Sequence, residues 1–251
     1  MIIPAISTIE FTNHCNFKCS YCQRYHDDGK RKNGFLDISL VEKMIKSGDF
    51  ANTTYIEFQQ NGEPTLHPKF TELVKMIKEV VPYVGLSTNG TYHKFKNNSA
   101  EGMGLCDTVT ISVHPETTQE DLDLTIKHLH SKYVQIRIQT LGKNPYGLNI
   151  EQYKNIPGIM LDDYELREFG LIYKPKFCID VKTSVTVQWD GDVVPCCNTV
   201  GKQKVLGNLH NEDIKTIWQR SNKQMFPYCN TCKSPSPFAN RLKFFSETLN
   251  S

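Results

Sequence analysis

Two periodicities alternate along the first two thirds of the 251-residue chain. Short runs rich in β-branched and aromatic residues predict strands at Ser7–Phe11, Tyr55–Gln60, Tyr83–Ser87, Thr108–Val113, Val134–Thr140 and Tyr164–Phe169. Between them, apolar residues with helical spacing predict helices at Ser39–Lys46, Lys69–Val80 and Thr118–Leu129. Ser39 and Glu42 also have the spacing of a capping box at a helix start.

This alternation predicts an α/β fold with a parallel sheet and right-handed crossovers. Six strand–helix units are too few for the complete eightfold barrel. We therefore expect a partial (β/α)6 barrel of the TIM type, with a flat doubly wound sheet as the alternative. In both architectures, the reactive loops lie at the C-terminal ends of the strands.

The pattern changes after about Gly170. Residues 184–195 alternate around an Asp190-Gly191 pair, which predicts a β-hairpin, and Asp213–Ser221 predicts a short helix. This segment is rich in cysteine and too small for a large core, and small modules of that kind usually need a metal. We therefore divide the chain into a barrel, residues 1–170, and a small cysteine-rich module of hairpin plus helix, residues 171–251.

The bulk composition excludes several classes of protein. Hydrophobic residues make up 39% of the chain, enough for a sizeable core, and the net charge of +2 is far from that of a strongly basic nucleic-acid binder. No apolar run is long enough to cross a bilayer, and the start MIIPAISTIEF lacks the features of a signal peptide. We therefore expect a cytoplasmic protein with no membrane or nucleic-acid partner.

Nine cysteines are unusual for such a chain, and in a reducing compartment clustered cysteines indicate metal ligands before disulfides. Cys15, Cys19 and Cys22 follow the first predicted strand within one loop. Three thiolates can hold three irons of a [4Fe–4S] cube and leave the fourth iron open for catalysis. The alternative is a zinc site completed by His14 or His26.

Another cysteine, Cys106, stands alone before an apolar strand, so we expect it to be a buried core thiol.

The loop Cys15-Asn-Phe-Lys-Cys19-Ser-Tyr21-Cys22 resembles the hallmark CX3CX2C motif of the radical S-adenosylmethionine (SAM) superfamily, including the aromatic residue before the third cysteine. The resemblance extends over nearly the whole chain. It implies an open iron chelated by the amino and carboxylate groups of SAM, reductive cleavage to a 5′-deoxyadenosyl radical, and abstraction of a substrate hydrogen atom. It also implies an external one-electron reductant, such as flavodoxin or ferredoxin.

Three further segments at predicted strand ends resemble SAM-binding motifs of the family. Asn61-Gly62-Glu63-Pro64 is similar to the GGEP motif, with Asn61 in place of the first glycine, and Ser87-Thr88-Asn89-Gly90 is similar to the TNG segment. The resemblance implies SAM contacts by Tyr21, Gly62, Glu63, Pro64, Ser87, Thr88, Asn89, Ser112, His114 and Arg137. Among these, Arg137 resembles an arginine that pairs with the SAM carboxylate, which a planar guanidinium suits.

The later cysteines resemble the SPASM and twitch modules of the same superfamily. Cys178 and Cys196 bracket a CX12GX4C segment, and Cys229 and Cys232 form a later CX2C. The resemblance implies that these four thiolates ligate one auxiliary [4Fe–4S] cluster, leaving no iron open, so that it transfers electrons. It selects Cys196 over the adjacent Cys197, whose role stays open. A four-cysteine zinc ribbon has the same spacing and is the alternative.

Three functions then remain to be weighed. The favoured one is a radical SAM oxidoreductase that dehydrogenates a polar small molecule, because a closed auxiliary cluster can accept the electron that a substrate radical must lose. The second is modification of a ribosomally made peptide, although the first strand starts within about ten residues of the chain start and leaves little room for a leader-binding domain. The third is a non-catalytic, metal-stabilised binding module, supported only by the basic run Lys30-Arg31-Lys32.

Candidate substrate contacts are the polar residues near predicted strand ends. These are Gln59, Gln60, Gln139, Thr140, Glu165, Arg167 and Glu168.

Overall fold

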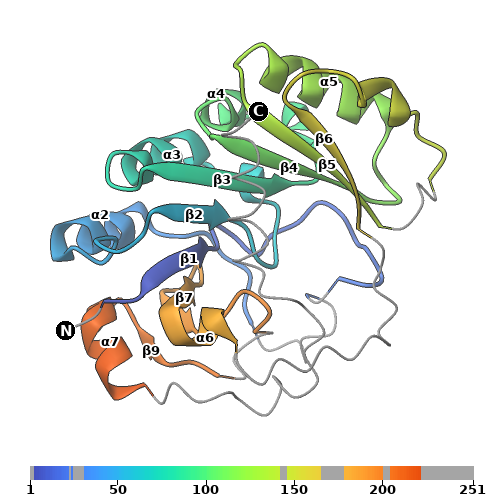
Figure 1. Cartoon of the computed structure of the whole chain (residues 1–251). Helices are drawn as coiled ribbons and strands as arrows, with labels where there is room; N and C mark the ends of the chain where they lie inside the picture. The colour runs from blue at the N-terminus through green and yellow to red at the C-terminus, as the bar shows by residue number, and fades with distance from the viewer. Residues whose placement is uncertain are drawn as a thin grey trace.

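The computed structural model describes residues 3–22, 24, 31–141, 146–164, 178–199 and 204–221. Within these residues, nine strands form one sheet in the order β6-β5-β4-β3-β2-β1-β7-β8-β9 (Figure 1). The strands are β1 (Ala5–Ile9), β2 (Tyr55–Phe58), β3 (Tyr83–Thr88), β4 (Thr108–Val113), β5 (Gln135–Leu141), β6 (Ile159–Tyr164), β7 (Ser184–Val187), β8 (Asp192–Val194) and β9 (Gly207–Asn208). Strands β1 to β7 pair in parallel, whereas β7–β8 and β8–β9 are antiparallel.

The order of the first six strands decides between the two expected architectures. Each strand from β1 to β6 lies beside the next one in the chain, and right-handed crossovers then place every connecting helix on the same face. Figure 1 shows the helices along one side of the curved sheet. These helices are α2 (Ile38–Ser47), α3 (Phe70–Lys78), α4 (Ser99–Met103) and α5 (Gln119–His130). The partial barrel is thus confirmed, and a doubly wound sheet, which has helices on both faces, is excluded.

The core lies between the sheet and these helices. Alternate strand residues such as Ile56 and Phe58 point toward it and are fully buried, as are Leu73, Val74 and Ile77 on α3. Burial of each such side chain stabilises the fold by about 1.5–3 kcal/mol. The regularly spaced apolar residues that predicted the helices therefore form the helix faces that pack on the sheet. The other face of the sheet is left for polar residues.

Local capping explains where two helices begin. Thr118 caps α5 in a capping box with Asp121, as the predicted helix start at Thr118 anticipates. The cap of α2 is Asp37, whose carboxylate accepts from the Ser39 N–H at 2.9 Å. The predicted capping box of Ser39 with Glu42 is therefore wrong, because the stronger acceptor lies two residues earlier and Glu42 instead lies 4.0 Å from Lys46 on the surface.

The sixth strand lies about five residues earlier than predicted. It runs over Ile159–Tyr164, where Ile136 of β5 pairs with Ile159, and residues 165–170 lie outside the described part. Gly158, with φ of 78°, makes the turn that starts the strand. The apolar Ile159 and Leu161 pack on the core. Their burial sets the register of β6 against β5, and the more polar run that predicted a strand at Tyr164–Phe169 gave no sign of it.

The predicted hairpin forms in the C-terminal module, with Gly191 at its turn in the left-handed conformation that glycine allows. The short helices α6 (Ile179–Thr183) and α7 (Ile214–Arg220) flank the hairpin. Asp213, the first residue of the predicted helix, is the N-cap of α7. Strand β7 pairs in parallel with β1, so the hairpin continues the sheet of the barrel. No helix in the described part of the chain has the length and apolar character to span a membrane.

Candidate active site

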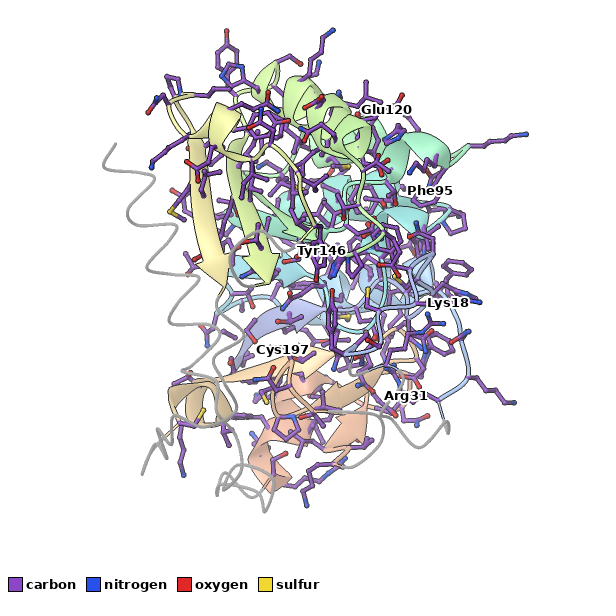
Figure 2. All side chains as sticks on the ribbon, turned by 90° about the vertical axis from the view of Figure 1, so that its right-hand side faces the viewer. Lys18, Arg31, Phe95, Glu120, Tyr146 and Cys197 are labelled. Atoms are coloured by element: carbon purple, nitrogen blue, oxygen red, sulfur yellow. The ribbon has the colours of Figure 1, made fainter. Side chains whose placement is uncertain are left out.

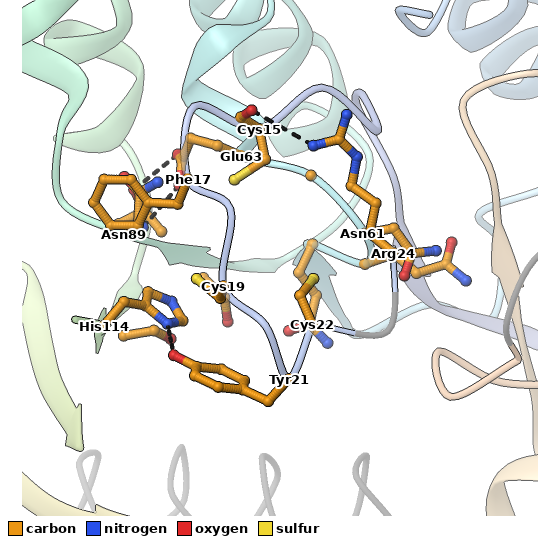
Figure 3. Close-up of a pocket in the computed structure, with 16 residues that line it drawn as sticks. Cys15, Phe17, Cys19, Tyr21, Cys22, Arg24, Asn61, Glu63, Asn89 and His114 are labelled. Carbon is orange, nitrogen blue, oxygen red and sulfur yellow. Dashed lines mark hydrogen bonds between the residues drawn. The ribbon is translucent and has the colours of Figure 1, made fainter. Parts of the chain in front are cut away.

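The three clustered cysteines line one cavity of about 210 Å³ at the C-terminal end of the parallel strands. Figure 3 shows their side chains around a common space. The loop that carries them is held in place by a turn in which the Cys22 N–H donates to the Cys19 carbonyl at 3.0 Å. Asn16 fixes it further, donating to the Thr91 hydroxyl at 3.0 Å and accepting from the Asn89 amide at 2.9 Å.

The chemistry of these thiols fits a metal centre. Burial raises the pKa of Cys15 to about 12 and that of Cys19 to about 11, so both are neutral thiols at neutral pH until a metal ion displaces the protons. Among the described residues, no three His, Cys, Asp or Glu side chains converge closely enough for a single metal ion. Three thiols on one loop are soft donors of the kind that hold iron–sulfur clusters or zinc.

The zinc alternative needed a fourth ligand. His14 lies against Phe35, with ring centroids 4.6 Å apart, and does not line the cavity. His26 lies outside the described residues.

The NGEP loop, residues 61–64, rests directly on the cysteine loop. A Cβ on Gly62 would lie 2.2 Å from the Thr12 carbonyl oxygen and 2.6 Å from that of His14, so only glycine permits this approach. The Glu63 N–H donates to the His14 carbonyl at 2.8 Å. Pro64 starts a 3-10 turn, Pro64–Leu66, and is buried behind the cavity wall.

The Glu63 carboxylate is buried and already accepts four hydrogen bonds. The donors are the Thr65 N–H and hydroxyl at 3.1 and 2.6 Å, the Thr88 hydroxyl at 2.8 Å and the Asn89 N–H at 2.7 Å. Burial raises its pKa and these bonds oppose that shift. The carboxylate therefore joins the NGEP loop to the loop after β3 (Figure 3), rather than standing free toward a ligand.

Residues at the C-terminal ends of β3 and β4, and just after them, complete the wall. Ser87, Thr88 and Asn89 line the cavity, as do Ser112 and His114. The Ser87 hydroxyl donates to Glu57 at 2.7 Å, within the polar face of the sheet.

An aromatic group closes one side of the cavity. The Tyr21 hydroxyl lies 2.6 Å from Nδ1 of His114, and the two rings stack with centroids 6.0 Å apart (Figure 3). Phe17 packs edge-on against the same imidazole. Burial lowers the pKa of His114, which keeps the ring neutral at physiological pH.

Arg137 lies away from these residues in the structure. It forms an ion pair with Asp162 of β6 and is not among the residues that line the cavity. Its predicted contact with SAM stays a prediction. Arg24, two residues after Cys22, does line the cavity, and its Nη1 lies 3.5 Å from the Cys15 carbonyl oxygen. No motif in the sequence pointed to Arg24, and the loop geometry alone places it.

The structure also locates some of the predicted substrate contacts and one residue of the basic run. Gln59 and Gln60 line the cavity, whereas Glu165, Arg167 and Glu168 lie outside the described residues. Arg31 is buried in an ion pair with Glu10, 2.6 Å between Arg31 Nη2 and Glu10 Oε2, so it is not part of an exposed basic patch.

The second group of cysteines is only partly described. Cys178 precedes α6, and Cys196 and Cys197 follow β8; all three are half-buried thiols. Figure 2 shows Cys197 beside the hairpin. Cys229 and Cys232 lie outside the described residues. Cys106 is a core thiol as predicted, 4% exposed, with its Sγ 3.6 Å from the Gly102 carbonyl oxygen.

Family models match both parts of the chain. The radical SAM superfamily model matches residues 9–144, and a model of an iron–sulfur cluster-binding domain, SPASM, matches residues 178–234. Because the first match spans more than half of the chain, the protein belongs to the radical SAM superfamily, with a SPASM domain at its C-terminal side.

Particular relatives are more distant. The chain is 22% identical to the tungsten-containing aldehyde ferredoxin oxidoreductase cofactor-modifying protein of Pyrococcus furiosus, over 89% of this chain and 86% of the relative. It is 29% identical to the GTP 3′,8-cyclase of Vibrio vulnificus, over 33% of this chain and 25% of the relative.

Two solved structures share the fold. BtrN in complex with AdoMet and 2-DOIA superposes with a TM-score of 0.60 at 19% identity, covering 99% of this chain and 89% of BtrN. Streptococcus suis SuiB bound to the precursor peptide SuiA superposes with a TM-score of 0.54 at 14% identity, covering 87% of this chain and 65% of SuiB.

Proposed function

We propose that this protein binds SAM beside a [4Fe–4S] cluster in the cavity and oxidises a polar small molecule in a dehydrogenase-like reaction. The observation that carries the proposal is that the cysteine loop, the NGEP loop and the loop after β3 converge on one cavity. When bound, the cluster and SAM supply the one-electron cleavage that yields a 5′-deoxyadenosyl radical, which removes a hydrogen atom from the substrate.

The residues of the chain bind and orient these groups. Cys15, Cys19 and Cys22 would hold the cluster. The Glu63 carboxylate already accepts from four donors, so backbone carbonyls of its loop would accept from the SAM ammonium. The Tyr21–His114 pair lines the cavity and would form one wall of the SAM site.

Sequence resemblance assigns the remaining SAM contacts. Ser112 and His114 would meet ribose hydroxyls, and their place in the cavity wall at the end of β4 supports this assignment. Arg137 would pair with the SAM carboxylate only by leaving or sharing Asp162. Its contribution is therefore the part of the SAM site that most needs measurement.

The C-terminal module supplies the second half of an oxidation. An alcohol carbon that has lost a hydrogen atom must still lose one electron and one proton to become a carbonyl. Cys178, Cys196, Cys229 and Cys232 would hold an auxiliary [4Fe–4S] cluster, whose four thiolates leave it suited to accept that electron. The match of residues 178–234 to an iron–sulfur cluster-binding domain supports this assignment. An external reductant such as flavodoxin or ferredoxin supplies the first electron.

Modification of a peptide is the second candidate function. The fold shared with SuiB, which binds the precursor peptide SuiA, favours it. BtrN, solved in complex with AdoMet and the small molecule 2-DOIA, shares the fold over nearly the whole chain, which favours the first candidate function. A non-catalytic binding module is disfavoured because Arg31 of the basic run is buried.

The test uses anaerobically reconstituted protein with dithionite as the reductant. Formation of 5′-deoxyadenosine from SAM supports a radical enzyme, and its absence from a protein that holds iron and binds SAM would support the binding module. Deuterated polyols, amino-cyclitols and short peptides are then offered in parallel. Deuterium transfer into 5′-deoxyadenosine from a deuterated alcohol, with a carbonyl product, supports the dehydrogenase, whereas transfer only from peptides supports the second candidate.

A further inference from the structure

Glu10 follows β1 directly, and its fully buried carboxylate lies where three parts of the chain meet. Oε1 accepts from Arg31 Nη1 at 3.2 Å and from the backbone N–H of Asn61 at 3.3 Å. Oε2 accepts from Arg31 Nη2 at 2.6 Å and from the backbone N–H of Trp189 at 3.2 Å. One carboxylate is thus bonded both to the NGEP loop and to the hairpin of the C-terminal module.

Arg31 extends this junction. Its side chain is 4% exposed, and Nη2 lies 3.8 Å from the Asp190 carboxylate at the hairpin turn. Figure 2 shows Arg31 beside the hairpin, on the side of the cysteine loop. A buried carboxylate with a two-pronged arginine partner holds its position more rigidly than a neutral pair, because both bonds are charge-assisted. Loss of Arg31 would leave the buried Glu10 carboxylate without this charge-assisted contact.

A second tie lies one residue from the first. The Gln60 amide, in the cavity wall, donates to the Thr199 carbonyl at 3.2 Å. The Thr199 N–H in turn donates to the carbonyl of Cys196 at 3.1 Å. Gln60, which precedes the NGEP loop, is therefore bonded to the C-terminal module, and Asn61, the first residue of the loop, is bonded to Glu10.

The NGEP loop has little freedom to adjust. Gly62 already sits against the Thr12 and His14 carbonyls at distances that exclude a methyl group, and Glu63 is bonded to Thr88 and Asn89. A shift of Asn61 would therefore be passed on to the backbone that faces the cavity, rather than absorbed by local slack.

We propose that Glu10 is a positioning residue for SAM binding, which fixes the NGEP loop through Asn61 and ties it to the hairpin through Arg31 and Trp189. The state of the C-terminal module then changes the affinity for SAM, and the coupling is reciprocal. This inference rests on the proposed function only in placing SAM in the cavity.

The primary test compares E10Q with D49N on reconstituted protein. Asp49 is a matched control: it is also a buried carboxylate that accepts from the C-terminal module, the Ile214 N–H at 3.0 Å, but it touches no residue of the cavity. SAM affinity is measured by calorimetry, and binding at the first cluster by the change that SAM causes in its reduced EPR spectrum. E10Q should bind SAM about tenfold or more weakly with full iron content, whereas D49N keeps the parent affinity.

R31K provides a second variant in case E10Q does not fold, because it keeps the charge and loses the two-pronged contact. It should weaken SAM binding by a smaller factor. Folded E10Q or R31K with full iron and the parent SAM affinity and EPR change would overturn the positioning role.

The link to the module needs a cycle of variants. In the parent, C229A/C232A should weaken SAM binding severalfold, and in E10Q the same change should have a smaller effect. An unchanged SAM affinity of C229A/C232A in the parent background would overturn the link. Failure of the proposed function is separate: it is a parent protein that binds and cleaves SAM yet oxidises nothing.

Discussion

The two cysteine-bearing regions of the molecule are organised in opposite ways. The cysteine loop takes its three thiols from eight consecutive residues, 15–22, and is held by a hydrogen bond that Asn16 donates to Thr91 and one that it accepts from Asn89. In the C-terminal module the cysteines lie far apart in sequence, and its hairpin is held by pairing with β1. A compact loop can present three ligands and leave one metal position open, whereas dispersed ligands can surround a metal centre completely. Under the proposed function, this difference would suit one site that reacts and one that carries electrons.

The largest expected effect is on iron content, which distinguishes the cysteine loop from the C-terminal module. The parent should hold about eight irons, in two cubes of four, and changing Cys15, Cys19 and Cys22 together to Ala should leave about four and abolish SAM cleavage. Iron analysis with visible absorption and EPR measures this. Stoichiometric zinc without visible absorption would refute both cluster assignments.

The second prediction concerns the C-terminal cysteines. In the C229A/C232A variant, SAM cleavage should persist while product formation falls, because the substrate radical loses its electron acceptor. C197A is the matched control and should keep the second cluster. Since metal binding and folding are linked, circular dichroism must first show a folded variant. A folded variant that lacks the second cluster but forms product at the parent rate would make that cluster structural.

A pair of glycines sharpens the comparison. Gly62→Ala places a methyl group 2.2 Å from the Thr12 carbonyl oxygen, so it should displace the NGEP loop and weaken SAM binding by tenfold or more, with a stability loss of about 1–3 kcal/mol. Gly191→Ala, which has φ of 81° and a contact of 2.8 Å with His210, should lower stability similarly and leave SAM binding at the first cluster less affected. Calorimetry and urea unfolding report the two quantities. Equal losses of affinity would show that the regions are not separable in this way.

Arg137→Ala tests the remaining SAM contact. If the guanidinium turns from Asp162 to the SAM carboxylate, its loss should weaken SAM binding by about 1.5–3 kcal/mol with little effect on folding. Asp162→Asn is the control, because it removes the competing partner seen in the structure and should not weaken SAM binding. Unchanged calorimetric affinity in Arg137→Ala would remove this residue from the site.

The smallest effect concerns pH. Burial lowers the pKa of His67, whose Nε2 lies 2.9 Å from the Leu36 carbonyl oxygen beneath the NGEP loop. The folded protein therefore favours the neutral ring, and the unfolded chain binds more protons below about pH 6.5. Stability from this group is present above that pH and lost as pH falls through the lowered pKa. Urea unfolding between pH 5 and 7.5 should show a shallower pH dependence for His67→Asn than for the parent; identical slopes would contradict it.

The sequence by itself determined the features that depend on local order. The spacing of Cys15, Cys19 and Cys22, the Gly62-Glu63-Pro64 turn after a strand and the Asp190-Gly191 hairpin are all set by neighbours in the chain. The strand–helix alternation likewise fixed an α/β fold and placed Ser87, Ser112 and His114 at strand ends, because side-chain periodicity is a property of the local backbone.

Only the tertiary structure decided which polar groups are already engaged. It committed Glu63 to Thr88 and Asn89, buried Arg31 against Glu10 and paired Arg137 with Asp162. It also moved β6 to the register in which Ile159 packs on the core. The physical reason is that a carboxylate or guanidinium takes whichever partner the fold brings within about 3 Å, and in these pairs that partner lies 21 to 26 residues away.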